Sequence, residues 1–243
     1  MFIVTGGSRG VGLEMARELL RQKAKVVICA RKQEGLDQAV AELGVEEDLL
    51  PVMAHIAKED QVDNLFNLTM NRFGRVDVLV NNVGMNLMTE SVVEVNYDQW
   101  QKIVDSNLNG TFLCSSRAAR IMKEQKSGKI INISSVAGQK ATPAMGIYGV
   151  AKSGVDMLTR VLASELAGHN IQVNAVAPAM VKTDFSKPFW SNPDVYQEIV
   201  KGIPMGRIAE PEEIVHPVLF LASGGASFMN GQTLIVDGGS LIV

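Results

Sequence analysis

The stretch TGGSRGVG, residues 5–12, decides how this chain folds, because its glycines have the spacing G-x-x-x-G-x-G. The apolar run FIV comes before it, and GLEMARELLRQ, which has helical period, follows. Glycines at a strand-to-helix turn let the backbone approach a pyrophosphate, and the free amides of the helix N-terminus attract an anion. We therefore predict a dinucleotide-phosphate loop at Gly6, Gly10 and Gly12. The alternative is a tight turn that needs only positive φ.

Apolar runs of strand length alternate with helical segments along the rest of the chain. The seven runs are FIVTGG, KVVICAR, LLPVMAH, VDVLVNN, KIINISS, IQVNAVAP and QTLIVDGG. Short, almost continuously apolar runs are typical of a parallel sheet that is buried on both faces. We predict one α/β domain over residues 1–243, a doubly wound Rossmann-type parallel sheet of about seven strands with helices on both faces.

Within this domain, we expect a cofactor half over about 1–95 and a catalytic half over about 96–243. Long helices are expected around 97–124 and 149–168. The stretch 180–204 is expected to be irregular, with the length of a functional loop such as a lid.

Composition excludes several classes of function. The chain has 243 residues, 47% of them hydrophobic, with a net charge of −3, and it has no basic run that would suggest nucleic acid. No apolar run approaches the roughly 20 residues of a membrane span, and the N-terminus does not resemble a signal peptide. Cys29 and Cys114 have no disulfide or metal spacing, and the three histidines are scattered. We expect a cytoplasmic protein that binds no nucleic acid, membrane or metal.

Two arginines indicate which dinucleotide is bound. The residue after the second strand faces the adenosine ribose, and an acidic residue there would bind the 2′-hydroxyl of NAD. Here that position is Arg31, and Arg9 lies in the glycine loop. Guanidinium groups suit a 2′-phosphate, so we predict NADP(H), with NAD(H) as the alternative. The arginines could instead be solvated surface charges.

Tyr148 and Lys152 lie four residues apart in YGVAK, which places them on one face of a helix. A neighbouring ammonium ion favours the phenolate, so Lys152 is expected to lower the pKa of Tyr148 and make it a general acid or base. Ser135, at the end of a buried strand, could hold a substrate oxygen beside the tyrosine. Ser134 is the alternative. Side chains alternate along a strand, so Ser134 and Ser135 point to opposite faces and only one of them can be the catalytic hydroxyl.

Taken together, the motifs resemble the short-chain dehydrogenase/reductase family. They are TGGSRGVG, NNVG at 81–84, SNLNG at 106–110, NISS at 132–135, YGVAK at 148–152, VNAVAP at 173–178 and VDGG at 236–239. The resemblance covers essentially the whole chain. It implies a catalytic tetrad in which Asn107 shapes a helix kink and holds a relay water and Ser135 orients the carbonyl. In this tetrad Tyr148 exchanges the proton, and Lys152 binds the nicotinamide ribose.

The resemblance also implies a set of cofactor contacts and an oligomer. The predicted contacts are Gly6, Ser8, Arg9, Gly10, Gly12, Arg31, His55, Ile56, Asn82, Gly84, Tyr148, Lys152, Pro178, Val181 and Thr183. Residues 183–205 would form a substrate loop that closes over the site. Its Phe185, Phe189 and Trp190 would form an apolar wall or, alternatively, pack in a subunit interface. Family members are commonly tetramers, so we expect a homotetramer joined through the two long helices.

Three positions depart from the family pattern. His55 stands where the family usually has Asp against the adenine, Val83 stands for Ala, and Ala179 stands for Gly. The first changes the adenine contact, because histidine is not an equivalent acceptor. ARKQEGLDQAV, His55 and KTDFSKPFW resemble NADPH carbonyl reductases of the family.

These features lead to ranked expectations of function. The first is an NADP(H)-dependent oxidoreductase that moves a hydride between the cofactor and a small-molecule ketone or secondary alcohol. The alternatives are a 3-oxoacyl-thioester reductase, for which Arg117, Arg120 and Lys123 could form a basic entrance, and an NAD-dependent alcohol dehydrogenase. A non-catalytic cofactor-binding regulator belongs to another class, and fold alone could not exclude it.

Overall fold

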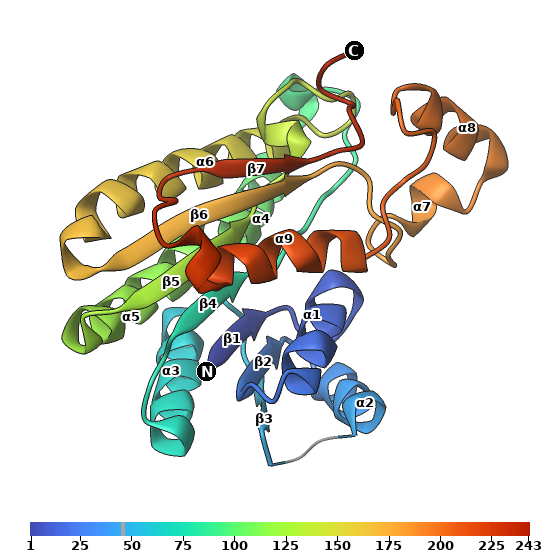
Figure 1. Ribbon diagram of the computed structural model, residues 1–243. Helices are drawn as coiled ribbons and strands as arrows, with labels where there is room; N and C mark the ends of the chain where they lie inside the picture. The colour runs from blue at the N-terminus through green and yellow to red at the C-terminus, as the bar shows by residue number, and fades with distance from the viewer. Residues whose placement is uncertain (45–46) are drawn as a thin grey trace.

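The computed structural model describes residues 1–44 and 47–243, which form a sheet covered by helices on both faces (Figure 1). Seven strands pair in parallel in the order β3-β2-β1-β4-β5-β6-β7. They are β1 (Phe2–Thr5), β2 (Val26–Ala30), β3 (Leu49–Met53), β4 (Val78–Asn81), β5 (Gly128–Ile133), β6 (Ile171–Pro178) and β7 (Thr233–Val236). The predicted doubly wound fold with seven strands is confirmed.

The helices bury the two faces of this sheet in separate apolar cores (Figure 1). One face carries α1 (Gly10–Arg21), α2 (Gln33–Leu43) and α9 (Glu212–Ala222), and the other carries α3 (Glu59–Phe73), α5 (Gly110–Gln125) and α6 (Gly146–Leu166). Consecutive strand residues point to opposite faces, so Ile3 lies in one core and its neighbour Val4 in the other. Burial on both faces explains why the strands read as continuous apolar runs.

Local sequence sets where several helices begin and end. α2 and α3 are followed by Gly44 and Gly74, whose φ values of +66° and +71° are left-handed, the usual conformation after a helix C-terminus. α4 (Tyr97–Val104) begins with a capping box, in which the side chains of Asn96 and Gln99 each accept a hydrogen bond from the other residue's backbone N–H. Short 3₁₀ turns complete the chain: η1 (Val92–Glu94), η3 (Val136–Gly138), η4 (Ala167–His169) and η5 (Gly224–Ala226).

The helix expected around 97–124 is present as α4, a π-helical turn, η2 (Asp105–Asn109), and α5 without a break, and the turn contains Asn107, where the resemblance implies a kink. One other expectation was wrong. The stretch expected to be irregular contains α7 (Lys187–Trp190) and α8 (Pro193–Lys201). Both are short and have proline in their first turn, and proline is favoured there by its fixed φ although it breaks a longer helical pattern.

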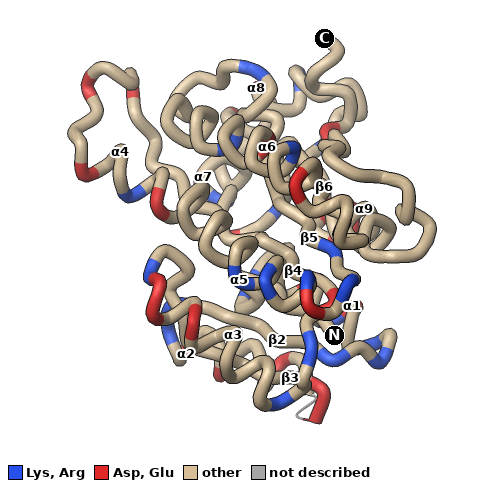
Figure 2. The backbone as a smooth tube through the Cα atoms, turned by 90° about the vertical axis from the view of Figure 1, so that its left-hand side faces the viewer, with Lys and Arg blue, Asp and Glu red and all other residues tan. Residues whose placement is uncertain are grey.

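The strand order places a crevice at the carboxyl edge of the sheet. β1 lies between β2 and β4, so the chain leaves β1 in one direction and resumes on its other side at β4. Ligands bind at such switch points in open α/β sheets. Figure 2 shows Lys and Arg interspersed with Asp and Glu along the chain, in keeping with the small net charge of −3. Within the described residues, no helix is both long and apolar enough to span a bilayer.

Candidate active site

One cavity of about 760 Å³ lies at this carboxyl edge and brings together most of the predicted site. Its volume falls in the range of small-molecule and cofactor pockets. The predicted residues that line it are Gly6, Ser8, Arg9, Gly10, Arg31, His55, Ile56, Asn82, Gly84, Ser135, Tyr148, Lys152, Pro178, Val181 and Thr183. We call the part around Arg9, Arg31 and His55 the arginine end, and the part around Ser135, Tyr148 and Lys152 the tyrosine end.

Two predicted residues, Gly12 and Asn107, lie behind the cavity wall. A Cβ atom on Gly12 would come within 2.4 Å of the Gly6 carbonyl oxygen, so this glycine lets α1 pack against the loop. Asn107 is fully buried, and its amide nitrogen donates to the carbonyls of Ile103 (2.8 Å) and Met85 (2.7 Å). Its side-chain oxygen accepts the Met85 N–H at 3.2 Å. Asn107 thereby holds the chain after β4 against the π-helical turn.

The glycine loop has the shape that a phosphate cradle needs. Gly6 and Gly10 have φ values of +68° and +55°, which side-chain-bearing residues rarely adopt. Asn82 supports the loop from β4, since its amide nitrogen donates to the carbonyls of Thr5 (3.0 Å) and Gly6 (3.3 Å). The N-terminus of α1 follows at Gly10 with its first amides unpaired within the helix. The loop therefore fits a pyrophosphate.

The arginine end holds cations that have no carboxylate partner among the described residues. Arg9 and Arg31 form none of the ion pairs found in that part of the chain. By contrast, five other arginines are paired with Asp or Glu: Arg17, Arg21, Arg75, Arg117 and Arg207. Lys32 also lines this end, although sequence reasoning did not select it. Side chains that bind a phosphate would be left free in this way.

His55 closes its own turn at the arginine end. Its Nδ1 accepts the Ala57 N–H at 3.2 Å, which assigns the ring proton of the neutral form to Nε2. Burial lowers the pKa of His55, and the positive charges of Arg31 and Lys58 lower it further. The imidazole is therefore neutral at pH 7 and offers a donor where an aspartate would offer an acceptor.

The two serines after β5 have different surroundings. Both contribute to the cavity wall, but the Ser134 hydroxyl is buried and donates to the Lys152 carbonyl at 3.4 Å. The Ser135 hydroxyl accepts the Ala137 N–H at 3.1 Å and lies close enough to Tyr148 to oppose the rise in the tyrosine pKa. Ser135 is therefore the serine that can share a substrate oxygen with Tyr148.

The predicted direction of the Tyr148 pKa was wrong. Burial raises the pKa of Tyr148 to about 12, because desolvation disfavours the phenolate more than the contact with Ser135 favours it. The Lys152 ammonium does not offset this, since it donates to the Ile133 carbonyl at 2.7 Å and lies 5.5 Å from the centre of the tyrosine ring. Tyr148 is thus a neutral phenol at pH 7, a proton donor.

Lys152 is buried, and Asp156, one turn further along α6, stabilises its positive charge. Burial lowers the pKa of Lys152 to about 8, and the charge of Asp156 opposes that fall. Asp156 is itself buried, and its carboxylate accepts hydrogen bonds from Gln139 Nε2 (2.6 Å) and Thr233 Oγ1 (3.2 Å). Sequence reasoning missed Asp156, although its position four residues after Lys152 was a readable signal.

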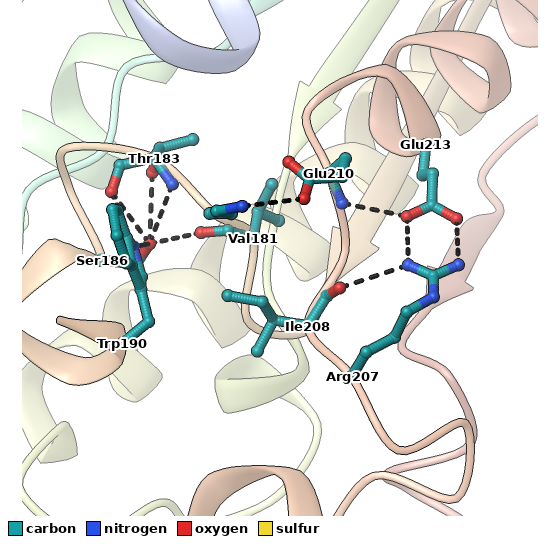
Figure 3. Close-up of polar contacts among 9 residues, drawn as sticks. Val181, Thr183, Ser186, Trp190, Arg207, Ile208, Glu210 and Glu213 are labelled. Atoms are coloured by element: carbon teal, nitrogen blue, oxygen red, sulfur yellow. Dashed lines mark hydrogen bonds and ion pairs between the residues drawn. The ribbon is translucent and has the colours of Figure 1, made fainter. Parts of the chain in front are cut away.

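Apolar side chains surround the tyrosine end. Phe185 and Phe189 line the cavity, in agreement with the apolar wall that was one of the two predicted alternatives. The Phe185 ring centre lies 6.3 Å from that of Tyr148. Trp190 does not line it but donates its indole N–H to the Thr183 carbonyl at 3.1 Å (Figure 3). Sequence reasoning missed Met85, Met145 and Met180, which also line the cavity, because isolated methionines carry no spacing signal.

Comparison with known proteins identifies the family. The family model described as Enoyl-(Acyl carrier protein) reductase matches residues 6–240. The chain is 39% identical to a 3-oxoacyl-[acyl-carrier-protein] reductase of Synechocystis sp., over 99% of this chain and 96% of that protein. It is 34% identical to dehydrogenase/reductase SDR family member 4 of Oryctolagus cuniculus, over 98% and 92%. The solved structure of ElxO with NADP bound matches with a TM-score of 0.94 and 32% identity, covering 100% of this chain and 98% of that one. The chain belongs to the short-chain dehydrogenase/reductase family, whose members are NAD(P)-dependent oxidoreductases of carbonyl and CH–OH groups.

Proposed function

We propose that this protein is an NADP(H)-dependent oxidoreductase that interconverts a ketone and a secondary alcohol. The observation that carries the proposal is that one cavity joins Arg9 and Arg31, which have no ion-pair partner among the described residues, to Tyr148, Ser135 and Lys152 at its other end. The glycine loop, the α1 N-terminus and the cavity volume fit a dinucleotide between these ends. When bound, the nicotinamide would supply or accept the hydride.

In this proposal each residue at the tyrosine end has a separate task. Ser135 holds the substrate oxygen, and the neutral phenol of Tyr148 donates a proton to that oxygen as the carbonyl is reduced. Lys152 binds the ribose next to the nicotinamide, and Asn107 keeps the chain after β4 in place. Burial raises the pKa of Tyr148, so at pH 7 the phenol carries the proton that carbonyl reduction requires.

At the arginine end, Arg9 and Arg31 would bind the 2′-phosphate of NADP(H). Their lack of carboxylate partners among the described residues supports this assignment, since a phosphate is the anion that would complete them. His55 would donate its Nε2 proton toward the adenine. NAD(H) remains the alternative cofactor.

The name of the Synechocystis relative favours a second candidate, a 3-oxoacyl-thioester reductase. Such an enzyme needs a basic surface for its acidic carrier protein. Arg117, one of the residues expected at a basic entrance, is bound by Glu59 (2.7 Å) and by Asp63. This pairing reduces the positive charge of that surface, so we rank the thioester substrate second.

We also propose a cytoplasmic homotetramer joined through α5 and α6. Four apolar side chains on these helices are between 43% and 53% exposed: Phe112, Val150, Met157 and Val161. Val150, Met157 and Val161 share one face of α6 because they are seven and four residues apart. An exposed apolar stripe of this kind is typical of a subunit contact. Light scattering on the purified protein tests the subunit number.

The function is tested by oxidation of NADPH and, separately, NADH with a diketone, an aromatic ketone and an acetoacetyl thioester. We expect turnover with NADPH and a ketone. Tyr148→Phe should lower kcat by about 100-fold to 10,000-fold, as expected when a general acid is removed. NADPH binding should survive in that variant, because the change removes only the hydroxyl.

Other outcomes would change the proposal. Preference for NADH would overturn the 2′-phosphate assignment, and turnover of the thioester alone would select the second candidate. An unchanged rate in Tyr148→Phe would contradict the catalytic role. No turnover, with NADPH binding intact, would favour the non-catalytic regulator.

A further inference from the structure

Ser186, just before α7, is a buried hydroxyl at which several hydrogen bonds meet (Figure 3). It is 3% exposed, and its Oγ donates to the Val181 carbonyl. The same oxygen accepts the Thr183 N–H at 3.2 Å and the Trp190 Nε1–H at 3.1 Å. A hydroxyl has one donor and two acceptor positions, so all of its hydrogen-bonding capacity is used within residues 181–190.

Trp190 connects this network to an apolar cluster formed by residues 200–208. Its indole N–H is shared between the Ser186 oxygen and the Thr183 carbonyl, each 3.1 Å from Nε1. Its ring packs against a cluster of buried side chains, Val200, Ile203 and Ile208. The ring is therefore anchored in the core while the N–H reaches the backbone of Thr183.

Thr183 lies beside the glycine loop. It lines the cavity, and a Cβ atom built on Gly10 would be in van der Waals contact with Thr183 Cγ2, at 3.4 Å. Thr183 is therefore a wall residue of the cavity next to the loop. Ser186 and Trp190 hold both its N–H and its carbonyl.

We propose that Ser186 and Trp190 are positioning residues, which hold Thr183 against the nicotinamide half of the bound cofactor. The inference rests on the proposed function, because it requires that a dinucleotide occupies the cavity. The part of Trp190 that matters for binding is its N–H, since the ring alone would anchor α7 but would leave the Thr183 carbonyl held only by Ser186, whose backbone N–H donates to it at 3.2 Å. The effect should be felt at the nicotinamide half, because Phe185, two residues after Thr183, lies against Tyr148, with the two ring centres 6.3 Å apart.

A second set of contacts holds the same segment from another direction (Figure 3). Val181 pairs with Ala209 in an isolated parallel bridge, and Lys182 Nζ lies 3.2 Å from Glu210 Oε1. Residues 181–182 are therefore attached to the chain before α9 independently of Trp190. Loss of the indole N–H should leave the segment folded, and this makes the variant informative.

The test is Trp190→Phe, which keeps an aromatic ring and removes the N–H. The readouts are the Kd of NADPH and the Kd of 2′,5′-ADP, a fragment with the adenosine 2′-phosphate but no nicotinamide. One net hydrogen bond corresponds to about a twofold to tenfold change in binding. We expect NADPH to bind more weakly by this factor and 2′,5′-ADP to bind as it does to the wild type.

Tyr196→Phe is the matched control, because Tyr196 packs against the same apolar cluster as Trp190 and its hydroxyl takes no part in the hydrogen bonds described for residues 181–190. It should change neither Kd. Equal weakening of both ligands in Trp190→Phe would show a merely structural role and overturn the inference, as would unchanged NADPH binding. Failure of the wild type to bind either ligand would instead overturn the proposed cofactor, and the inference with it.

A double-mutant cycle tests whether Trp190 acts through Thr183. Thr183→Val removes the hydroxyl that would meet the nicotinamide amide. If the two residues act together, Trp190→Phe should weaken NADPH binding less in the Thr183→Val background than in the wild type. Fully additive effects would contradict the proposed path.

Discussion

The arginine end and the tyrosine end of the cavity are built in different ways. At the arginine end, the contiguous stretch 5–12 shapes the site through backbone conformation, and exposed cations complete it. At the tyrosine end, buried side chains after β5 and on α6 are held by hydrogen bonds between different elements, and residues 181–190 by bonds within their own segment. Positive-φ glycines thus shape the loop at the arginine end, with Asn82 as support, whereas the tyrosine end depends on desolvated side chains that tertiary packing supplies.

The largest expected effect concerns the tyrosine end, where the buried Lys152 should make the free energy of unfolding depend on pH. Because the pKa of Lys152 falls from 10.5 to about 8 on folding, the unfolded chain holds more protons between these values. Stability should therefore rise with pH in that window, by about 3 kcal/mol if the full shift is realised. Lys152→Met should lack this rise in urea unfolding measured at pH 7.5 and pH 10.

The control for this experiment is Lys123→Met, which removes an exposed lysine of α5 and should retain the rise. Measurements stop at pH 10 because Tyr148 acts in the opposite direction above it. Its folded pKa of about 12 means that stability is lost as the pH rises from 10 towards 12. The same pH dependence in Lys152→Met and in the wild type would show that Lys152 is not desolvated.

The next effect in size tests the backbone at the arginine end. Gly12→Ala places a Cβ atom 2.4 Å from the Gly6 carbonyl oxygen, so the loop must shift. We expect a loss of about 2 kcal/mol in the free energy of unfolding, typical of overpacking, and weaker NADPH binding. Gly168→Ala is the matched control, because a Cβ there meets nothing within 4 Å. Equal stability of the two variants would show that the loop is not tightly constrained.

A smaller effect is expected for the cations of the arginine end. Arg31→Ala removes one charged partner of the 2′-phosphate, and a hydrogen bond to a charged group corresponds to roughly a tenfold change or more in binding. The ratio of kcat/KM for NADPH to that for NADH should fall by about this factor, with NADH almost unaffected. Arg120→Ala, an exposed arginine of α5, should leave the ratio unchanged. Parallel loss with both cofactors would assign Arg31 a structural role.

The smallest effect concerns His55. Its pKa is lowered on folding, so the unfolded chain binds the proton more readily below pH 6.5 and stability falls as the pH falls. His55→Asn should remove this small contribution without loss of the turn, because asparagine can accept the same Ala57 N–H. Urea unfolding at pH 5.5 and pH 7.5 measures it, with the exposed His169→Asn as control. A steeper pH dependence in His55→Asn would contradict the lowered pKa.

Sequence patterns predicted the seven strands because each is buried on both faces, and they predicted the glycine loop because positive φ requires glycine. They did not predict α7 and α8, whose length of one to three turns leaves too little periodicity to detect. They left Trp190 either in an apolar wall or in a subunit interface, because a tryptophan in a loop does not show which way its N–H points.

By itself, the sequence determined the order of the seven strands and the glycine turn after the first of them, and it indicated the candidate site residues, since these depend on local conformation and residue type. Only the tertiary structure decided how those residues are charged and held. Burial keeps Tyr148 protonated, Asp156 supports Lys152, and Ser186 with Trp190 fixes Thr183. Desolvation and long-range hydrogen bonds depend on which side chains meet in space, and this information lies in the packing of the folded chain.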